Sequence, residues 1–214
     1  MVDYKPGASL LINENLENEF VFGTGTSYGS EICIEKTFGK LRGWFGYTLA
    51  WTTRQFDAIN NGKRFFPRFD RRHEISTVAT YPFSKRLTFS GSWTFYTGNA
   101  VSLPTGRTIG LDVPGTLNNN TYFNLSPVYA ERGNFRMPNY HRLDLALIFK
   151  LRPKRGSSDL TFSAYNAYSR LNPYFIAFEN RDNGTGITGT PAGYRPRAIT
   201  LFPIIPSITY NFKF

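Results

Sequence analysis

The densest group of chemically competent side chains is the run Asp70-Arg71-Arg72-His73-Glu74, which combines carboxylates, cations and an imidazole. Acid–base catalysis needs such groups to converge on a pocket with fixed geometry. Here the run stands where a long connection rich in Asn, Arg and Phe enters a predicted strand. That position favours a hydrogen-bonded loop anchor over a catalytic site.

A second acid–base set is His141-Arg142-Leu143-Asp144. Alternate residues of a strand share a face, so Arg142 and Asp144 are predicted to form an ion pair on a polar face. His73 and His141 lie far apart without metal-ligand spacing, and the single Cys33 has no partner for an internal disulfide. We therefore expect no enzyme activity, no metal site and no cofactor.

Composition and charge indicate which kinds of membrane segment and which partners to expect. The 214 residues carry a net charge of +10, mean hydropathy is −0.33, and 17% of residues are aromatic. The sequence contains no run of about 18 apolar residues, so no transmembrane helix is predicted. The positive charge suits nucleic acid, an anionic membrane surface or an acidic ligand, but no basic helix or nucleic-acid motif is present, so nucleic acid is not an expected partner.

Period-2 alternation of apolar and polar residues predicts seven strands, several of ten residues or more, close to the ~9–11 residues that cross a bilayer at a tilt. The predicted strands are residues 30–38, 42–54, 73–83, 86–96, 140–150, 159–168 and 199–214. One face of these strands is predicted to meet lipid, with Leu87, Phe89, Trp93, Phe95, Leu143, Leu145, Leu147, Tyr210 and Phe212. The opposite face is predicted to meet a barrel lumen, with Ser90, Ser92, Asp144, Thr209 and Asn211.

The final residues alternate strictly, with Ile208, Tyr210, Phe212 and Phe214 on one face. This pattern fits either the closing strand of a soluble sandwich or the last strand of an outer-membrane β-barrel. The connections favour the barrel, because they are short after the first, third and fifth strands and long after the second, fourth and sixth. Outer-membrane barrels alternate short periplasmic turns with long extracellular loops. Residues 55–72, 98–138 and 169–198 are thus predicted to be extracellular.

Several segments together resemble TonB-dependent outer-membrane receptors, in family order and covering most of the chain from Gly23 onward. None of them is a catalytic signature. They are G-T-G-T-S-Y-G-S-E (23–31), F-D-R-R-H (69–73), R-M-P-N-Y-H-R-L-D-L (136–145), F-S-A-Y-N-A-Y-S-R-L-N-P-Y-F (162–175) and L-F-P-I-I-P-S-I-T-Y-N-F-K-F (201–214).

The resemblance implies a barrel of roughly 22 strands with a plugged lumen in the bacterial outer membrane. It implies uptake of a scarce ligand such as a siderophore, vitamin or oligosaccharide, powered by an inner-membrane energy-coupling protein. It also implies that the barrel-assembly machinery reads the aromatic tail. The signal peptide, plug domain and energy-coupling box of the family are not found, so we expect either a C-terminal fragment of a receptor or a truncated gene product. Residues 1–26 are then an irregular extracellular segment, and 27–214 are barrel.

Six aromatic and basic residues of the predicted loops are candidates for ligand contact. For the aromatic residues, packing between loops is the alternative. The six candidates are Arg64, Phe66, Arg68, Tyr122, Phe123 and Tyr174. The loop cations suit lipopolysaccharide phosphates, an anionic ligand or simply solvent. Two other functions stay open, a structural or adhesive outer-membrane barrel and a soluble β-sandwich or barrel that binds a small molecule.

Overall fold

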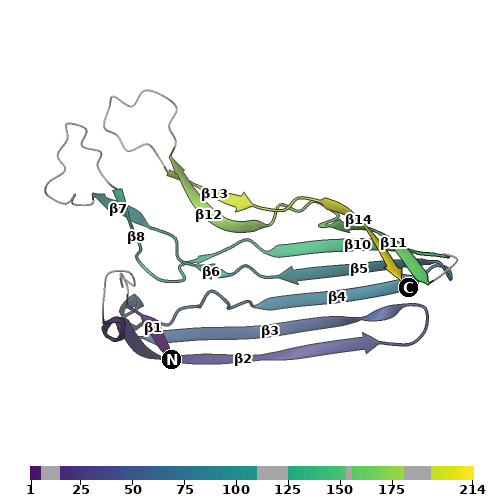
Figure 1. Cartoon of the computed structure of the whole chain (residues 1–214). Helices are drawn as coiled ribbons and strands as arrows, with labels where there is room; N and C mark the ends of the chain where they lie inside the picture. Colours follow the sequence, from purple (N-terminus) through teal and green to yellow (C-terminus); the bar gives the residue numbers. More distant parts are fainter. Residues whose placement is uncertain (6–14, 110–124, 153–155, 181–193) are drawn as a thin grey trace, which may run out of the picture. The chain divides into compact units, whose positions relative to one another are not determined.

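The computed structural model describes residues 1–5, 15–109, 125–152, 156–180 and 194–214. Over these residues the fold is all-β, with two short 3-10 turns and no α-helix (Figure 1). The strands are β1 Val2–Tyr4, β2 Phe20–Lys36, β3 Arg42–Phe56, β4 His73–Pro82, β5 Leu87–Tyr96, β6 Ala100–Val101, β7 Gly106–Ile109, β8 Leu125–Val128, β9 Phe135–Arg136, β10 Tyr140–Leu151, β11 Ser157–Tyr165, β12 Pro173–Asn180, β13 Tyr194–Thr200 and β14 Ile205–Lys213; the 3-10 turns are Leu16–Glu19 and Asn60–Gly62.

The main sheet has the hydrogen-bonded order β1-β2-β3-β4-β5-β10-β11-β14. Each of the seven predicted strands is present, as β2, β3, β4, β5, β10, β11 and β14, and they follow one another in this order. The pairings from β3 to β14 are antiparallel. Antiparallel all-β structure is therefore confirmed.

The chain divides into two compact units. One, which we call the loop unit, comprises residues 1–29, 50–71 and 99–137. The other, the sheet unit, comprises residues 30–49, 72–98 and 138–214. The sheet unit contains the paired lengths of most long strands, and the loop unit contains most of the long connections.

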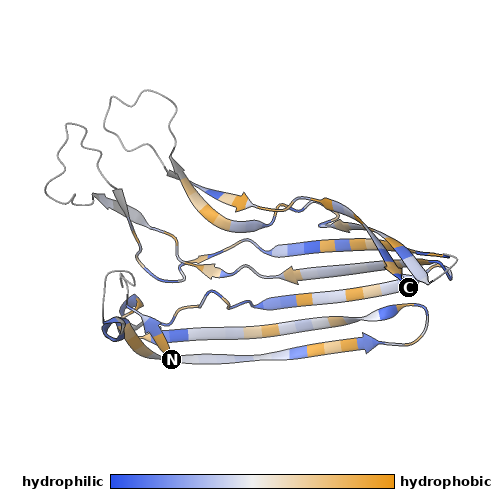
Figure 2. Cartoon of the chain, viewed as in Figure 1, coloured by the Kyte–Doolittle hydropathy of each residue, from blue (hydrophilic) through white to orange (hydrophobic). Residues whose placement is uncertain are grey.

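Register in the sheet unit separates apolar from polar side chains. Leu147 lies opposite Phe89 on β5 and Phe162 on β11, whereas the next position, Ala146, lies opposite Ser90 and Ser163. Residues paired across an antiparallel sheet share a face, so each strand adds to the same two surfaces. Figure 2 shows the resulting bands of alternating hydropathy along β4 and β10. We call these surfaces the apolar face and the polar face.

The apolar face contains all nine residues predicted to meet lipid, and the polar face contains all five predicted to meet the lumen. The register pairs Trp93 with Leu143, and Leu160 with Tyr210, on the apolar face. It pairs Asp144 with Ser92 on the polar face. The predicted division of side chains between two faces is confirmed.

The first long strand begins at Phe20, ten residues before the predicted start. Residues 1–26 were predicted to be irregular, but two glycines of this stretch lie within the strand and admit close neighbours. A Cβ on Gly23 would lie 2.3 Å from the Gln55 carbonyl oxygen, and one on Gly25 would lie 2.2 Å from the Met1 sulfur. Glycine in a strand permits such close approach, so the strand continues through them.

The long connections contain hairpins that the sequence did not predict. β6 pairs with β9, β7 with β8, and β12 with β13. The predicted last strand, 199–214, is divided: β13 ends at Thr200 and β14 begins at Ile205. Pro203 lies in the gap, where its missing N–H removes a donor for strand pairing.

Buried apolar side chains are few and lie in the loop unit. Phe56, Ile59 and Phe65 form a small core against which Val21 packs. Among the described residues of the sheet unit, no large apolar side chain is buried. No helix among the described residues is both long and apolar enough to span a membrane.

Candidate functional site

Asp70, the first member of the acid–base run, is a fully buried anchor of the loop unit. Its side chain is 0% exposed and forms an ion pair with Arg136 of β9. Its Oδ1 accepts a hydrogen bond from the Thr52 N–H at 2.6 Å, and its carbonyl oxygen accepts one from Arg136 Nη1 at 2.6 Å. A buried carboxylate needs a cation and hydrogen-bond donors beside it, and Asp70 has both, so it holds these neighbours in place. The predicted role as a loop anchor is confirmed for Asp70.

The other members of that run bind separate partners. Arg71 donates from Nε to Asn99 Oδ1 at 3.0 Å. The backbone N–H groups of Arg72 and His73 both donate to Thr97 Oγ1, at 2.8 and 3.1 Å. These contacts fix the chain as it enters β4.

Ion pairs also connect distant segments within the loop unit. Asp3 accepts from Arg132 at 2.9 Å and lies 3.6 Å from Arg54, while Lys63 pairs with Glu131 at 3.1 Å. Asn60 and Arg132 exchange two hydrogen bonds, from Asn60 Nδ2 to the Arg132 carbonyl at 3.0 Å and from the Arg132 N–H to Asn60 Oδ1 at 2.7 Å. The N-terminal residues and two connections are thereby joined into one structure.

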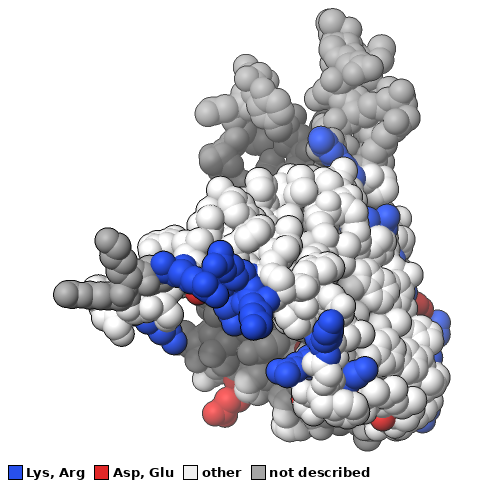
Figure 3. Space-filling view, turned by 90° about the vertical axis from the view of Figure 1, so that its right-hand side faces the viewer, with Lys and Arg blue, Asp and Glu red and all other residues white. Residues whose placement is uncertain are grey.

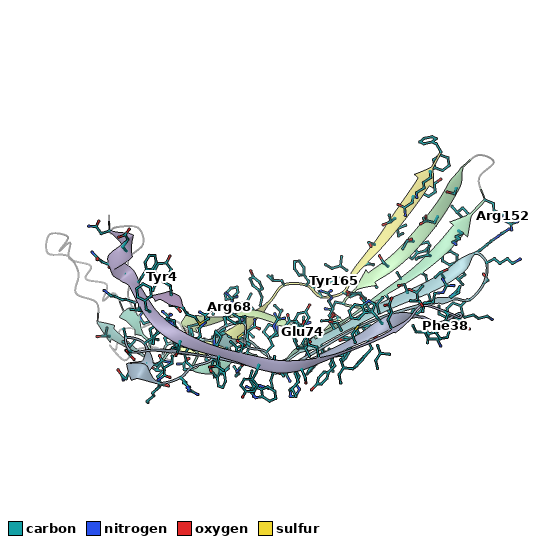
Figure 4. The ribbon with its side chains drawn as sticks, turned by 90° about the horizontal axis from the view of Figure 1, so that it is seen from below. Tyr4, Phe38, Arg68, Glu74, Arg152 and Tyr165 are labelled. Atoms are coloured by element: carbon teal, nitrogen blue, oxygen red, sulfur yellow. The ribbon has the colours of Figure 1, made fainter. Side chains whose placement is uncertain are left out.

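Three of the candidate ligand residues lie in the loop unit. Arg64 is exposed and lies 3.4 Å from Gln55 Oε1 through its Nε. Phe66 lies beneath the Arg136 guanidinium, with Cζ 4.7 Å from the ring centroid. Arg68 is exposed (Figure 4). Phe66 thus takes part in loop packing, and Arg64 and Arg68 remain accessible to solvent.

Tyr174 is a fourth candidate and lies on β12 in the sheet unit. It is exposed and makes an edge contact with Phe175, with ring centroids 5.8 Å apart. Tyr122 and Phe123 lie outside the described residues. The described candidates are therefore divided between the two units.

The polar face contains a network that the sequence revealed only in part. Arg142 donates from Nε to Asp144 Oδ2 at 2.9 Å, which confirms the predicted ion pair. Its Nη1 donates to the hydroxyls of Tyr140 at 3.1 Å and Tyr165 at 2.8 Å, and its Cζ lies 4.2 Å from the Tyr165 ring centroid. Tyr96 stacks on Tyr140 with centroids 4.5 Å apart.

This network joins three strands through their side chains. Tyr96 comes from β5, Arg142 from β10 and Tyr165 from β11. The tyrosines of this network were not predicted, because contacts between strands depend on their register. The alternation pattern of a single strand does not give that register. The network stiffens the polar face at that level of the sheet.

Aromatic side chains gather at both ends of the apolar face. At the end next to the long connections, both histidines bind tyrosine hydroxyls: His73 Nδ1 lies 2.9 Å from Tyr47 and His141 Nδ1 lies 2.7 Å from Tyr168. At the end next to the short turns, the ring pairs are Tyr81–Phe83, Phe149–Phe162 and Phe212–Phe214. Midway between the two bands, at the level of Leu145, the face carries the small residues Gly43, Ala79, Gly91 and Ala164.

Comparison with models of protein families, with curated proteins and with solved structures finds no match.

Proposed function

We propose that the chain forms part of the wall of a transmembrane β-barrel in the bacterial outer membrane. The observation that carries this proposal is an exposed apolar face without an apolar core behind it. Phe162 is 42% exposed, Ile208 69% and Tyr210 60%, although all three lie on the same face in register. Exposed apolar area of this extent in a soluble domain favours association, whereas lipid accommodates it directly.

The spacing of the aromatic bands supports the same proposal. His141 and Phe149 lie in the two bands on β10, eight residues apart, or about 27 Å along a strand. Membrane barrels have an apolar belt about 25 Å tall with aromatic girdles at both interfaces, and their strands are tilted. The apolar face therefore has a height that suits a bilayer.

The polar face suits a barrel interior. Its side chains are mainly Ser, Thr and Asn, together with the network around Arg142. A cation in contact with lipid would be costly, but this one binds Asp144 and two tyrosine hydroxyls on the face away from the apolar surface. Such a face accommodates water or a protein plug.

The finer proposal is that the barrel belongs to a TonB-dependent receptor that imports a siderophore, vitamin or oligosaccharide. Its support is the resemblance of five segments to that family and the alternation of short and long connections along the chain. In this scheme an inner-membrane protein supplies energy, and the exposed Arg64 and Arg68 lie on a surface that meets lipopolysaccharide or ligand. The chain itself supplies wall and outer loops and performs no catalysis.

Two measurements on cells test these proposals in turn. Extraction of membranes with alkaline carbonate should leave the protein in the pellet, and its release would contradict membrane insertion. Deletion of residues 105–125 should then weaken binding and uptake of candidate siderophores, vitamins and oligosaccharides while surface abundance stays unchanged. Normal insertion without energy-dependent uptake of any of them would favour an adhesive or structural barrel.

A further inference from the structure

The positive charge of the chain is concentrated at the short-turn end of the sheet unit. Residues 35–42, 83–88, 149–159 and 210–214 contain ten Lys and Arg but two Asp and Glu, a net charge of +8 out of +10 for the chain. The rest of the chain has fifteen cations and thirteen carboxylates. The three long connections contain twelve cations and six carboxylates over 89 residues, whereas the short-turn segments have a net charge of +8 over 30 residues, so the density of positive charge is about four times higher at the short turns.

The cations of these segments lie at one end of the sheet, as the register requires. The Lys150 N–H donates to the Arg86 carbonyl at 2.8 Å, Lys213 lies opposite Ser157, and Arg42 lies opposite Thr80. Figure 3 views this end and shows several groups of Lys and Arg with few acidic residues between them. The described members, all exposed, are Lys36, Lys40, Arg42, Lys85, Arg86, Lys150, Arg152 and Lys213, which we call the basic row.

Ion pairs do not account for the basic row. The ion pairs found among the described residues use Arg54, Lys63, Arg132, Arg136 and Arg142, none of which belongs to it. Its two nearest carboxylates in sequence are Glu35 and Asp159, and Asp159 Oδ1 accepts from Asn211 Nδ2 at 2.9 Å. By register Arg42, Lys150 and Lys213 belong to the polar face, whereas Lys36, Lys40, Lys85 and Arg86 lie in or next to the turns 37–41 and 83–86. The excess charge of these two turns is therefore open to an anionic partner.

Exposed phenylalanines accompany the cations. Phe38 is 74% exposed with Lys36 Nζ 5.8 Å from its ring centroid, and Phe83 is 61% exposed two residues from Lys85. Figure 4 shows Phe38 and Arg152 at this same end. Apolar rings beside long cationic side chains suit the boundary between acyl chains and phosphates, because the rings enter hydrocarbon while the charged ends extend to the headgroups.

We propose that the four turn residues of the basic row, Lys36, Lys40, Lys85 and Arg86, bind the phosphate headgroups of anionic phospholipids in the leaflet that surrounds the short turns. This inference rests on the proposed barrel and adds a lipid preference to it. These four cations belong to two separate turns, one between β2 and β3 and one between β4 and β5, which suits a plane of headgroups, whereas an acidic protein would need only a compact patch. The attraction is electrostatic and weakens as salt screens it.

The test uses the protein reconstituted in phosphatidylcholine vesicles that contain about one third phosphatidylglycerol. The vesicles are dissolved in mild detergent, the protein is isolated at low salt, and the bound lipids are counted by mass spectrometry. We expect phosphatidylglycerol to be enriched over its share in the vesicle, and we expect 0.5 M NaCl to reduce that enrichment. An isolate with the lipid composition of the vesicle would overturn the proposal.

The decisive variant neutralises four cations of the row, K36Q, K40Q, K85Q and R86Q. Since one cation near an anionic surface changes binding by roughly fivefold, the four together should reduce the enrichment at least about tenfold. The matched control, K63Q, R64Q, R68Q and R170Q, removes the same charge elsewhere and should retain it. Equal losses in both variants would mean that only net charge matters and would refute a site at the short turns.

A second variant separates lipid binding from folding. K36R, K40R and K85R keep the charge, so enrichment should persist; its loss would show that charge is not the cause. Failure of the unaltered protein to remain in carbonate-washed vesicles would contradict the barrel itself. Insertion without enrichment would refute only the lipid preference.

Discussion

The assignment of the two faces can be tested at one pair of adjacent residues, Leu145 and Ala146 in the middle of β10. Leu145 is five residues from Tyr140 and six from Leu151, which places it about 17–20 Å from either end of the strand. It lies opposite Gly91 and Ala164 on the apolar face. A lysine there is too short to reach either end, and its cross-strand partners offer no polar group.

We expect L145K to lose about 2–4 kcal/mol of folding free energy in a bilayer. That loss lowers the ratio of folded to unfolded protein by about 30-fold to 1,000-fold. A146K should cost far less, because its side chain joins Ser90 and Ser163 on the polar face. Both variants introduce the same charge into the same strand, so each is the control for the other.

The assay is urea unfolding of vesicle-inserted protein, followed by the fluorescence of Trp44, Trp51 and Trp93. The midpoint for L145K should fall well below that of the unaltered protein, and the midpoint for A146K should stay near it. Equal losses, or a larger loss for A146K, would refute the assignment of lipid and lumen to the two faces.

Three further predictions concern sidedness, the loop anchor and the tail. In a C33S background, a cysteine at Arg68 should react with an impermeant thiol reagent on intact cells and one at Lys85 should not; the reverse pattern would invert the topology. D70N should loosen the loop unit by about 1–3 kcal/mol, because Arg136 and the Thr52 N–H lose a charged acceptor. This should appear as faster limited proteolysis, while a matched change at the exposed Asp57 should leave the rate unchanged. Deletion of residues 210–214 removes the last four β11–β14 register pairs and should abolish surface assembly, and normal surface abundance would refute that role for the tail.

The strands of the sheet unit were predictable because their side chains alternate with period 2. The pattern of β5, for example, predicted both its start near Leu87 and its end at Tyr96. The start of β2 at Phe20 was missed, since its glycines are explained only by the approach of Gln55 and Met1. The alternation within one segment predicts that the segment is a strand, but it does not predict which strands lie beside it.

The difference between contacts within one strand and contacts between distant segments also explains which parts of the candidate site could be predicted. Both residues of the Arg142–Asp144 pair lie on one strand, so spacing alone predicted it. The Asp70–Arg136 pair joins residues 66 positions apart, and the sequence indicated an anchor at Asp70 without indicating its partner. The hairpin of β6 and β9 was missed for the same reason, because Ala100 finds its partner Arg136 across a long connection.

The strict register of β10 between β5 and β11 also constrains how such a protein can change over generations. Loss of one residue within β10 would move every side chain beyond it to the opposite face, placing Leu147 inward and Lys150 outward toward hydrocarbon. Gain or loss of residues in residues 98–138 carries no such penalty, because that connection lies beyond the ends of β5 and β10. Length variation in a lineage should therefore accumulate in the connections while strand lengths stay fixed. New binding surfaces can therefore evolve in the connections without changes to the strands of the sheet.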